Sequence, residues 1–143
     1  MLVVIATKEE LKLVEKLGYE KNPILITGVG ALNVMRALKD IPKDTHILNI
    51  GYCGSNKIKV GTECYIGKVQ LHHENVEYAE PCYILGGDIP CYTSTDFVVK
   101  TKKESPCVFD MELAYICSMF NKVSAFKVVS DNLSVEDYEK NIK

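Results

Sequence analysis

The sequence has 143 residues, of which 47% are hydrophobic and 25% are charged, and its formal net charge is −2. This length and apolar content suffice for one packed core, so we expect a single domain spanning residues 1–143. The small net charge and the scattered lysines exclude an extended basic surface for nucleic acid or for an anionic membrane, and we expect a small-molecule partner instead.

No segment is typical of an export signal or a membrane anchor. The apolar run at residues 2–6 is too short for either and lacks a basic start, so we interpret it as a buried strand. Six cysteines could form disulfides, but a chain with this much core and no secretory signal seldom requires them. The cysteines and the three histidines show no zinc-ligand spacing, so we expect no metal and no cofactor. We therefore predict a cytoplasmic protein with reduced thiols.

Short apolar runs alternate with helical stretches, which is typical of layered α/β architecture. In chain order, the pattern predicts a strand at 2–6, a helix at about 8–17, a strand at 23–26, a glycine turn at 28–30, a helix with Ala31, Met35 and Leu38 on one face, and a strand at 47–50. Residues 61–84 predict antiparallel strands. They are followed by a strand at 90–93, a largely buried helix at 111–120, a strand at 125–129 and a terminal helix capped by Ser134.

Polar residues gather where the predicted strands end, which is where ligands bind in α/β sheets. Glu10 follows the first strand, residues 51–55 follow the third, and Asp131 ends the last. Glu112 opens the apolar helix at 111–120, where a buried carboxylate needs hydrogen-bond donors. The backbone amides of the helix start could satisfy Glu112 as well as a ligand could, and both interpretations stay open.

Two glycine-containing motifs suggest other enzyme classes, and both are disfavoured. Residues 28–33 (GVGALN) partly match a dinucleotide fingerprint, but Asn33 replaces the third glycine and the motif follows the second strand rather than the first. Residues 51–55 (GYCGS) are similar to a nucleophile elbow with Cys53 as the nucleophile. The acid that should stand between nucleophile and histidine in such hydrolases is missing, so a buried structural thiol is favoured.

Six short segments together resemble one known family. They are residues 4–10 (VIATKEE), 28–30 (GVG), 48–54 (LNIGYCG), 93–98 (TSTDFV), 109–114 (FDMELA) and 128–132 (VVSDN). Segments of this kind occur in this order in the nucleoside phosphorylase and nucleosidase family, and the sequence is most similar to the methylthioadenosine/S-adenosylhomocysteine nucleosidases. The resemblance implies a three-layer αβα fold with a central mixed sheet, a homodimer, and cleavage of the N-glycosidic bond of a purine nucleoside.

The resemblance also implies a role for each matching residue. Glu10 would activate the attacking water, Asp131 would protonate the purine at N7, and Glu112 would hold the ribose hydroxyls. These roles suit a reaction that leaves positive charge on the sugar and negative charge on the base. The other substrate-binding residues that the resemblance implies are Phe97 stacked on the base, Met111 against the sugar, and Val98, Cys53, Gly54 and Ser130 around the purine.

Water and phosphate are the two acceptors used within this family. Phosphorylases bind the anion with arginines, whereas this sequence has a single arginine, Arg36, in the middle of a predicted helix. We therefore expect hydrolysis, although Lys127 could meet an anion. Phosphorolysis remains an alternative. So does a non-catalytic nucleoside-binding protein, because the chain is shorter than typical members around residues 75–90 and 97–107.

Overall fold

The computed structural model describes residues 1–72 and 82–142. The strands are β1 (Leu2–Ile5), β2 (Ile24–Ile26), β3 (His46–Gly54), β4 (Glu63–Leu71), β5 (Tyr83–Ile84), β6 (Ile89–Thr93), β7 (Val108–Asp110) and β8 (Lys122–Asp131). The helices are the 3-10 helix η1 (Lys8–Glu10), which leads into α1 (Leu11–Lys16), then α2 (Ala31–Leu38), α3 (Leu113–Met119) and α4 (Val135–Ile142). The antiparallel strands expected at 61–84 are confirmed for β4 and β5, while residues 73–81 lie outside the described residues.

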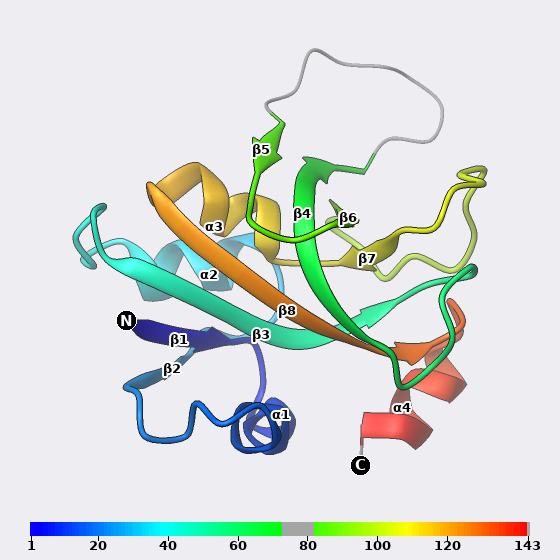
Figure 1. The fold of residues 1–143 in the computed structure, drawn as a ribbon, viewed down its shortest axis with the longest axis horizontal. Coiled ribbons are helices and arrows are strands. Elements are labelled where there is room, and N and C mark those ends of the chain that lie inside the picture. The colour runs from blue at the N-terminus through cyan, green and yellow to red at the C-terminus, as the bar shows by residue number, and fades with distance from the viewer. Residues whose placement is uncertain (73–81, 143) are drawn as a thin grey trace.

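All eight strands belong to one mixed sheet, with the order β2-β1-β3-β7-β6-β4-β5 and with β8 paired to both β3 and β4. β8 runs parallel to β3 along its whole length and antiparallel to β4. Because β3, β7, β6 and β4 are also paired in series, β8 closes these strands into a ring (Figure 1). The predicted α/β class with a central mixed sheet is confirmed.

Helices cover both faces of the sheet because successive strand side chains point in opposite directions. On β1, Val3 and Ile5 pack against α1, whereas Val4 packs against α2 and α3. Figure 1 accordingly shows α1 on one side of β1 and β3, and α2 and α3 on the other. The expected three layers are therefore present.

The predicted inward face of α2 was wrong in one respect. The spacing of Ala31, Met35 and Leu38 marked these residues as the buried face, but the structure buries Val34 and Leu38 and leaves Met35 52% exposed. Both sets are spaced at helical intervals, and packing against Val4 and Ile116 selects the second set.

Two strands extend beyond their predicted bounds and a third was not predicted, and all three differences matter for the site. β3 continues past residue 50 to Gly54, and β8 continues past residue 129 to Asp131. β7 was not predicted at all, and it ends at Asp110 directly before α3. These extensions carry acidic and glycine residues to one end of the strand ring.

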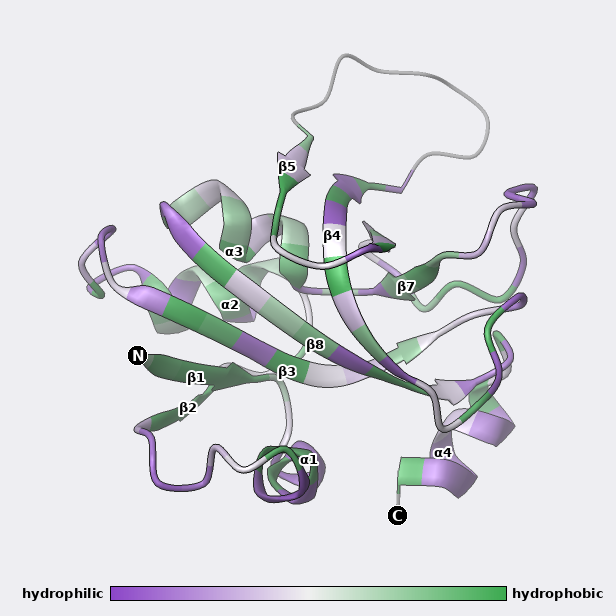
Figure 2. Cartoon of the chain, viewed as in Figure 1, coloured by the Kyte–Doolittle hydropathy of each residue, from purple (hydrophilic) through white to green (hydrophobic). Residues whose placement is uncertain are grey.

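Hydropathy follows the layers. Figure 2 shows hydrophobic residues along β1, hydrophobic residues interrupted by hydrophilic ones along β3 and β8, and more hydrophilic residues along α4. Among the described residues, no helix combines the length and the apolar character needed to span a bilayer.

Candidate active site

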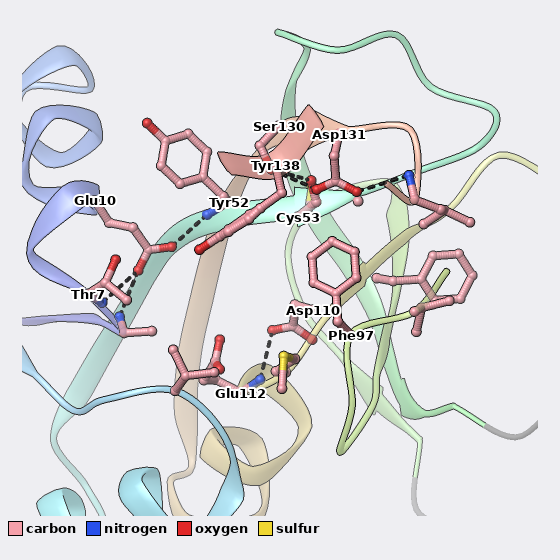
Figure 3. Close-up of a pocket in the computed structure, with 17 residues that line it drawn as sticks. Thr7, Glu10, Tyr52, Cys53, Phe97, Asp110, Glu112, Ser130, Asp131 and Tyr138 are labelled. Atoms are coloured by element: carbon pink, nitrogen blue, oxygen red, sulfur yellow. Dashed lines mark hydrogen bonds between the residues drawn. The ribbon is translucent and has the colours of Figure 1, made fainter. Parts of the chain in front are cut away.

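A cavity of about 210 Å³ opens where β1, β3, β7 and β8 end. Figure 3 shows Glu10, Glu112 and Asp131 on three sides of this pocket, with Tyr138 and Phe97 between them. The full lining consists of Ala6, Thr7, Glu10, Val29, Tyr52, Cys53, Gly54, Phe97, Val98, Phe109, Asp110, Met111, Glu112, Ser130, Asp131, Leu133 and Tyr138. The lining is largely apolar with a few converging polar groups, which is typical of a small-molecule site.

Glu10 is held by the turn that links β1 to η1. Its Oε1 accepts hydrogen bonds from the backbone N–H groups of Ala6 at 2.8 Å and Thr7 at 3.2 Å, and its Oε2 accepts one from Tyr52 at 2.7 Å. Burial raises the pKa of the Glu10 carboxyl, while the Lys127 ammonium and the three backbone donors partly offset this rise. Oε2 keeps acceptor capacity for a ligand or a water molecule.

Glu112 stands between β7 and α3 and closes the opposite side of the pocket. Its Oε2 accepts a hydrogen bond of 2.9 Å from the backbone N–H of Gly30, in the glycine turn before α2. Burial, together with the negative charge of Asp110, raises the pKa of Glu112 to about 7. Its second oxygen can accept hydrogen bonds from hydroxyl groups of a ligand.

Asp110 fixes the chain at this corner. Its Oδ2 accepts hydrogen bonds from the backbone N–H groups of Glu112 at 3.3 Å and Leu113 at 2.8 Å, which caps α3. Its Oδ1 accepts one of 2.5 Å from Thr93 Oγ1. The side chain of Glu112 therefore starts from a rigid backbone.

Asp131 is the last residue of β8. Its Oδ2 accepts a hydrogen bond of 2.9 Å from Ser130 Oγ, and its Oδ1 accepts one of 2.9 Å from the backbone N–H of Leu133. Leu133 has a positive φ of 61°, in the turn that follows β8. Burial raises the pKa of Asp131, and the hydrogen bonds to Ser130 and Leu133 counteract this only in part. A carboxyl of this kind can retain a proton and donate it.

Two aromatic rings from distant segments meet at the pocket. Phe97 lies in the loop after β6 and Tyr138 lies on α4, and their ring centroids are 5.6 Å apart with an interplanar angle of 58°. The Tyr138 ring points across the pocket between Asp131 and Glu10 (Figure 3). Burial and the carboxylates, Glu10 first among them, raise the pKa of Tyr138 to about 12. The phenol therefore remains a hydrogen-bond donor at neutral pH.

Two glycines of β3 let two of the acids lie against the strand. A Cβ at Gly51 would be 2.6 Å from Glu10 Oε2, and a Cβ at Gly54 would be 2.7 Å from Asp131 Oδ1. Both distances are far below van der Waals contact, so any larger residue would displace the carboxylates.

The structure brings every predicted site residue to the pocket, though it does not test their roles. The nine are Glu10, Cys53, Gly54, Phe97, Val98, Met111, Glu112, Ser130 and Asp131. Sequence reasoning missed Tyr138 and Leu133, which follow Asp131 without any distinctive motif. The suggestion that Lys127 could meet an anion in the site was wrong, because its ammonium is buried against Asp110 at 3.1 Å and does not line the pocket.

The arrangement suits acid–base chemistry on a neutral ligand. It supplies a hydrogen-bonded carboxylate at Glu10, an acceptor at Glu112, a buried acid at Asp131 and an aromatic surface at Phe97. Among the described residues, no group of three or more His, Cys, Asp or Glu side chains is placed to hold a metal ion.

No protein-family model matches the chain, and no curated protein matches it. Among solved structures, the 5′-methylthioadenosine/S-adenosylhomocysteine (MTA/SAH) nucleosidase of S. pneumoniae, with the transition-state inhibitor MT-ImmA, matches with a TM-score of 0.77 and 17% identity over 99% of this chain and 90% of that one. The MTA/SAH nucleosidase of Colwellia psychrerythraea, in complex with adenine, matches with a TM-score of 0.76 and 15% identity over 99% and 87%. An Asp-to-Asn variant of the MTAN of Chlamydia trachomatis, bound to MTA, matches with a TM-score of 0.75 and 16% identity over 99% and 88%. At these identities the likeness establishes the fold, which is that of the MTA/SAH nucleosidases.

Proposed function

We propose that this protein hydrolyses the N-glycosidic bond of a purine nucleoside related to MTA or S-adenosylhomocysteine. The observation that carries the proposal is the convergence of Glu10, Glu112 and Asp131 on one pocket beside the aromatic ring of Phe97. The ligands of proteins with the same fold, namely MTA, adenine and a transition-state inhibitor, support the choice of substrate class.

In the proposed reaction, the oxygen of a water molecule forms a bond to C1′ of the ribose while the bond from C1′ to N9 of the purine breaks. Glu10 takes a proton from the water, and the electron pair of the broken bond goes to the purine. Asp131 gives its proton to N7, so the purine leaves as a neutral molecule. The two carboxyl groups return to their starting states by proton exchange with solvent.

The remaining side chains bind and orient the substrate. Glu112 would accept hydrogen bonds from the ribose hydroxyls and stabilise the positive charge that develops on the sugar. Phe97 would stack on the purine and Met111 would pack against the sugar. The other residues proposed to surround the purine are Val98, Cys53, Gly54 and Ser130.

Water rather than phosphate is the favoured acceptor because of the charges around the pocket. Neither lysine nor arginine occurs among the described residues that line it. Arg36 is exposed on α2, and the ammonium of Lys127 is already paired with Asp110. A phosphate dianion in this pocket would face three acidic groups without a paired cation.

The test is to incubate the purified protein with MTA, S-adenosylhomocysteine and adenosine, with and without phosphate, and to quantify free base by chromatography. We expect phosphate-independent release that is lost in Glu10→Gln. Strictly phosphate-dependent release would indicate a phosphorylase instead. Tight nucleoside binding by calorimetry without release under either condition would indicate a binding protein and contradict hydrolysis.

We also propose that the protein forms a homodimer in a reducing cytoplasm. Three apolar side chains of α2 and of the glycine turn before it are exposed beside the pocket: Leu32 at 83%, Met35 at 52% and Val29 at 44%. A two-fold symmetric contact would bury this patch next to the site. The six free cysteines, of which five are buried, support a reducing compartment.

Sedimentation velocity tests the proposed dimer. We expect the wild-type protein to sediment as a dimer and Leu32→Glu to sediment as a monomer, because the charge would be buried unpaired in the contact. A wild-type monomer at the concentrations used for activity would contradict the proposal.

A further inference from the structure

Lys127 is a buried cation in the middle of β8. Its side chain is 1% exposed, and it does not line the pocket. Removing an ammonium group from water is unfavourable unless anions compensate for the loss of hydration. Anions close to Lys127 must therefore compensate for its lost hydration.

Asp110 is its direct partner, with 3.1 Å between Nζ and Oδ2. Asp110 is held in place by its hydrogen bonds to Thr93 and to the start of α3. The pair thus links β8 to the corner that carries Glu112. Burial by itself would lower the pKa of Lys127, but Asp110, Glu112 and Glu10 outweigh burial and raise it. The ammonium therefore stays charged.

Glu10 approaches the same ammonium on the same face of β3, above Gly51. Gly51 is the β3 residue paired with Lys127 in the parallel register. A Cβ at Gly51 would be 2.6 Å from Glu10 Oε2 and 3.3 Å from Lys127 Nζ, so both groups occupy the space above this glycine. The absence of a side chain at Gly51 lets the cation and the carboxylate face each other.

The other titratable groups around this cluster stay neutral at pH 7. Four thiols lie near Lys127 on neighbouring elements, and burial raises the pKa of each: Cys53 on β3, Cys64 on β4, Cys91 on β6 and Cys117 on α3. Three phenols face Glu10 or Glu112, and burial raises the pKa of each: Tyr52, Tyr115 and Tyr138. The charges in this cluster are therefore those of Lys127, Asp110, Glu10 and Glu112.

We propose that Lys127 is a positioning residue that partly compensates this buried acidic cluster and so favours the ionised forms of Glu10 and Glu112 when the substrate binds. It does so through space from behind the pocket wall, without contact to the substrate. The inference rests on the proposed function for its catalytic consequence, since ionised Glu10 and Glu112 are the forms needed to accept protons and hydroxyl hydrogen bonds.

The test follows the glutamate side chains directly. Protein labelled with carbon-13 at the glutamate carboxyl is titrated by NMR, and the two resonances are assigned with Glu10→Gln and Glu112→Gln. In Lys127→Met, which is neutral and of similar length, we expect the titration midpoints of Glu10 and Glu112 to move upward by about one pH unit or more. Lys127→Arg, which keeps the charge, should leave both midpoints in place. Unchanged midpoints in folded Lys127→Met would overturn the proposal.

The double variant Asp110→Asn with Lys127→Met separates charge compensation from a merely structural role, because it removes both members of the buried ion pair together. Asp110 raises the pKa of Glu112 and Lys127 lowers it, so removing both should return the Glu112 midpoint toward that of wild type. Lys127 lowers the pKa of Glu10, whereas Asp110 is not among the main influences on that pKa. The titration midpoint of Glu10 should therefore remain high in the double variant. A Glu10 midpoint equal to that of wild type in the double variant would overturn the proposal, even if Lys127→Met does not fold.

Activity supplies the second measurement. The acid limb of kcat/KM in Lys127→Met should move to higher pH together with the NMR midpoints. Release of no base by the wild-type protein would contradict the proposed function and leave the NMR result standing. The two failures are therefore distinguishable.

Discussion

Asp131 shows how one residue can be prepared for two protonation states. As an ion, it accepts hydrogen bonds from Ser130 Oγ and from the backbone N–H of Leu133. The Ser130 hydroxyl also lies 3.3 Å from the carbonyl oxygen of Cys53, so it can turn to donate there when Asp131 is protonated. Both states keep their hydrogen bonds, which allows the proton to leave without a buried group losing its partner.

Replacing the acid tests this role. Asp131→Asn keeps the size of the side chain and the hydrogen bond from Leu133 but has no proton to give to N7. We expect kcat to fall by about 10²–10⁴-fold while adenine still binds, as measured by steady-state kinetics and calorimetry. A kcat within tenfold of wild type would show that another group supplies the proton.

Tyr138 is a second residue whose chemistry can be isolated. Its phenol makes no hydrogen bond to the described protein residues, although its ring packs against Phe97. If the hydroxyl donates to the substrate, Tyr138→Phe should raise KM by about three- to tenfold and change kcat little, because the ring contact remains. Tyr19→Phe, outside the pocket, is the matched control. Equal KM values for the two variants would show that the Tyr138 hydroxyl does not bind the substrate and that only its ring contributes to the pocket.

The sequence was informative for residues that follow strands and silent for residues that depend on distant partners. Glu10, Glu112 and Asp131 could be located because a strand or an apolar helix lies next to each of them. Tyr138 could not, because α4 is an ordinary amphipathic helix. Lys127 was misjudged because its partner, Asp110, ends a strand that has only three residues.

At the scale of the element, β3 positions the acidic residues of the site. It is paired with β1, β7 and β8, and its last residues run beneath Glu10 and Asp131. Gly51 and Gly54 are therefore close-approach positions, where the missing side chain is what allows the carboxylate to sit. The sequence alone predicted that this strand ends at residue 50, because Gly51 and Gly54 interrupt the apolar pattern by which a strand is identified.

Gly54→Ala should disturb the chemistry more than the fold. The new methyl group would lie 2.7 Å from Asp131 Oδ1, and because two hydrogen bonds hold that carboxylate it must shift. A displacement of this size is expected to lower kcat by about 100-fold. Gly18→Ala is the control, since Gly18 has a φ of +86° and open space around it, so the substitution strains the backbone far from the site. We expect Gly18→Ala to lower Tm without lowering kcat, and an unchanged kcat in Gly54→Ala would contradict the argument.

On the scale of the whole molecule, layers were predictable and the closure of the strands was not. The apolar runs at β1, β3 and β8, which are separated by helical stretches, indicate strands that are covered on both faces. The ring formed by β8 with β3 and β4 depends on pairing between residues 61 to 77 positions apart, and local periodicity contains no information on such pairing. The ring is nevertheless what brings Lys127, Asp110 and the pocket acids into one buried cluster.

A buried acidic cluster should make the folded state less stable where it is ionised. The pKa of Glu112 is about 7 in the folded protein and 4.5 as an ordinary side chain, so between these values the folded state binds more protons than the unfolded state. Stability contributed by this group is therefore fully present below about pH 4.5 and is lost as the pH rises toward 7. Glu112→Gln, which can still accept the hydrogen bond from Gly30, should remove this loss.

We accordingly expect Glu112→Gln to be more stable than wild type at pH 8, by on the order of 3 kcal/mol, and to match wild type near pH 4.5. Urea unfolding at both pH values measures the difference, and Glu139→Gln on the exposed side of α4 is the control that should change stability at neither. The same variant should lose activity, because the neutral amide is a weaker acceptor for the ribose hydroxyls and stabilises positive charge on the sugar poorly. Glu112→Gln that is no more stable than wild type at pH 8 would contradict the raised pKa of Glu112 in the folded protein.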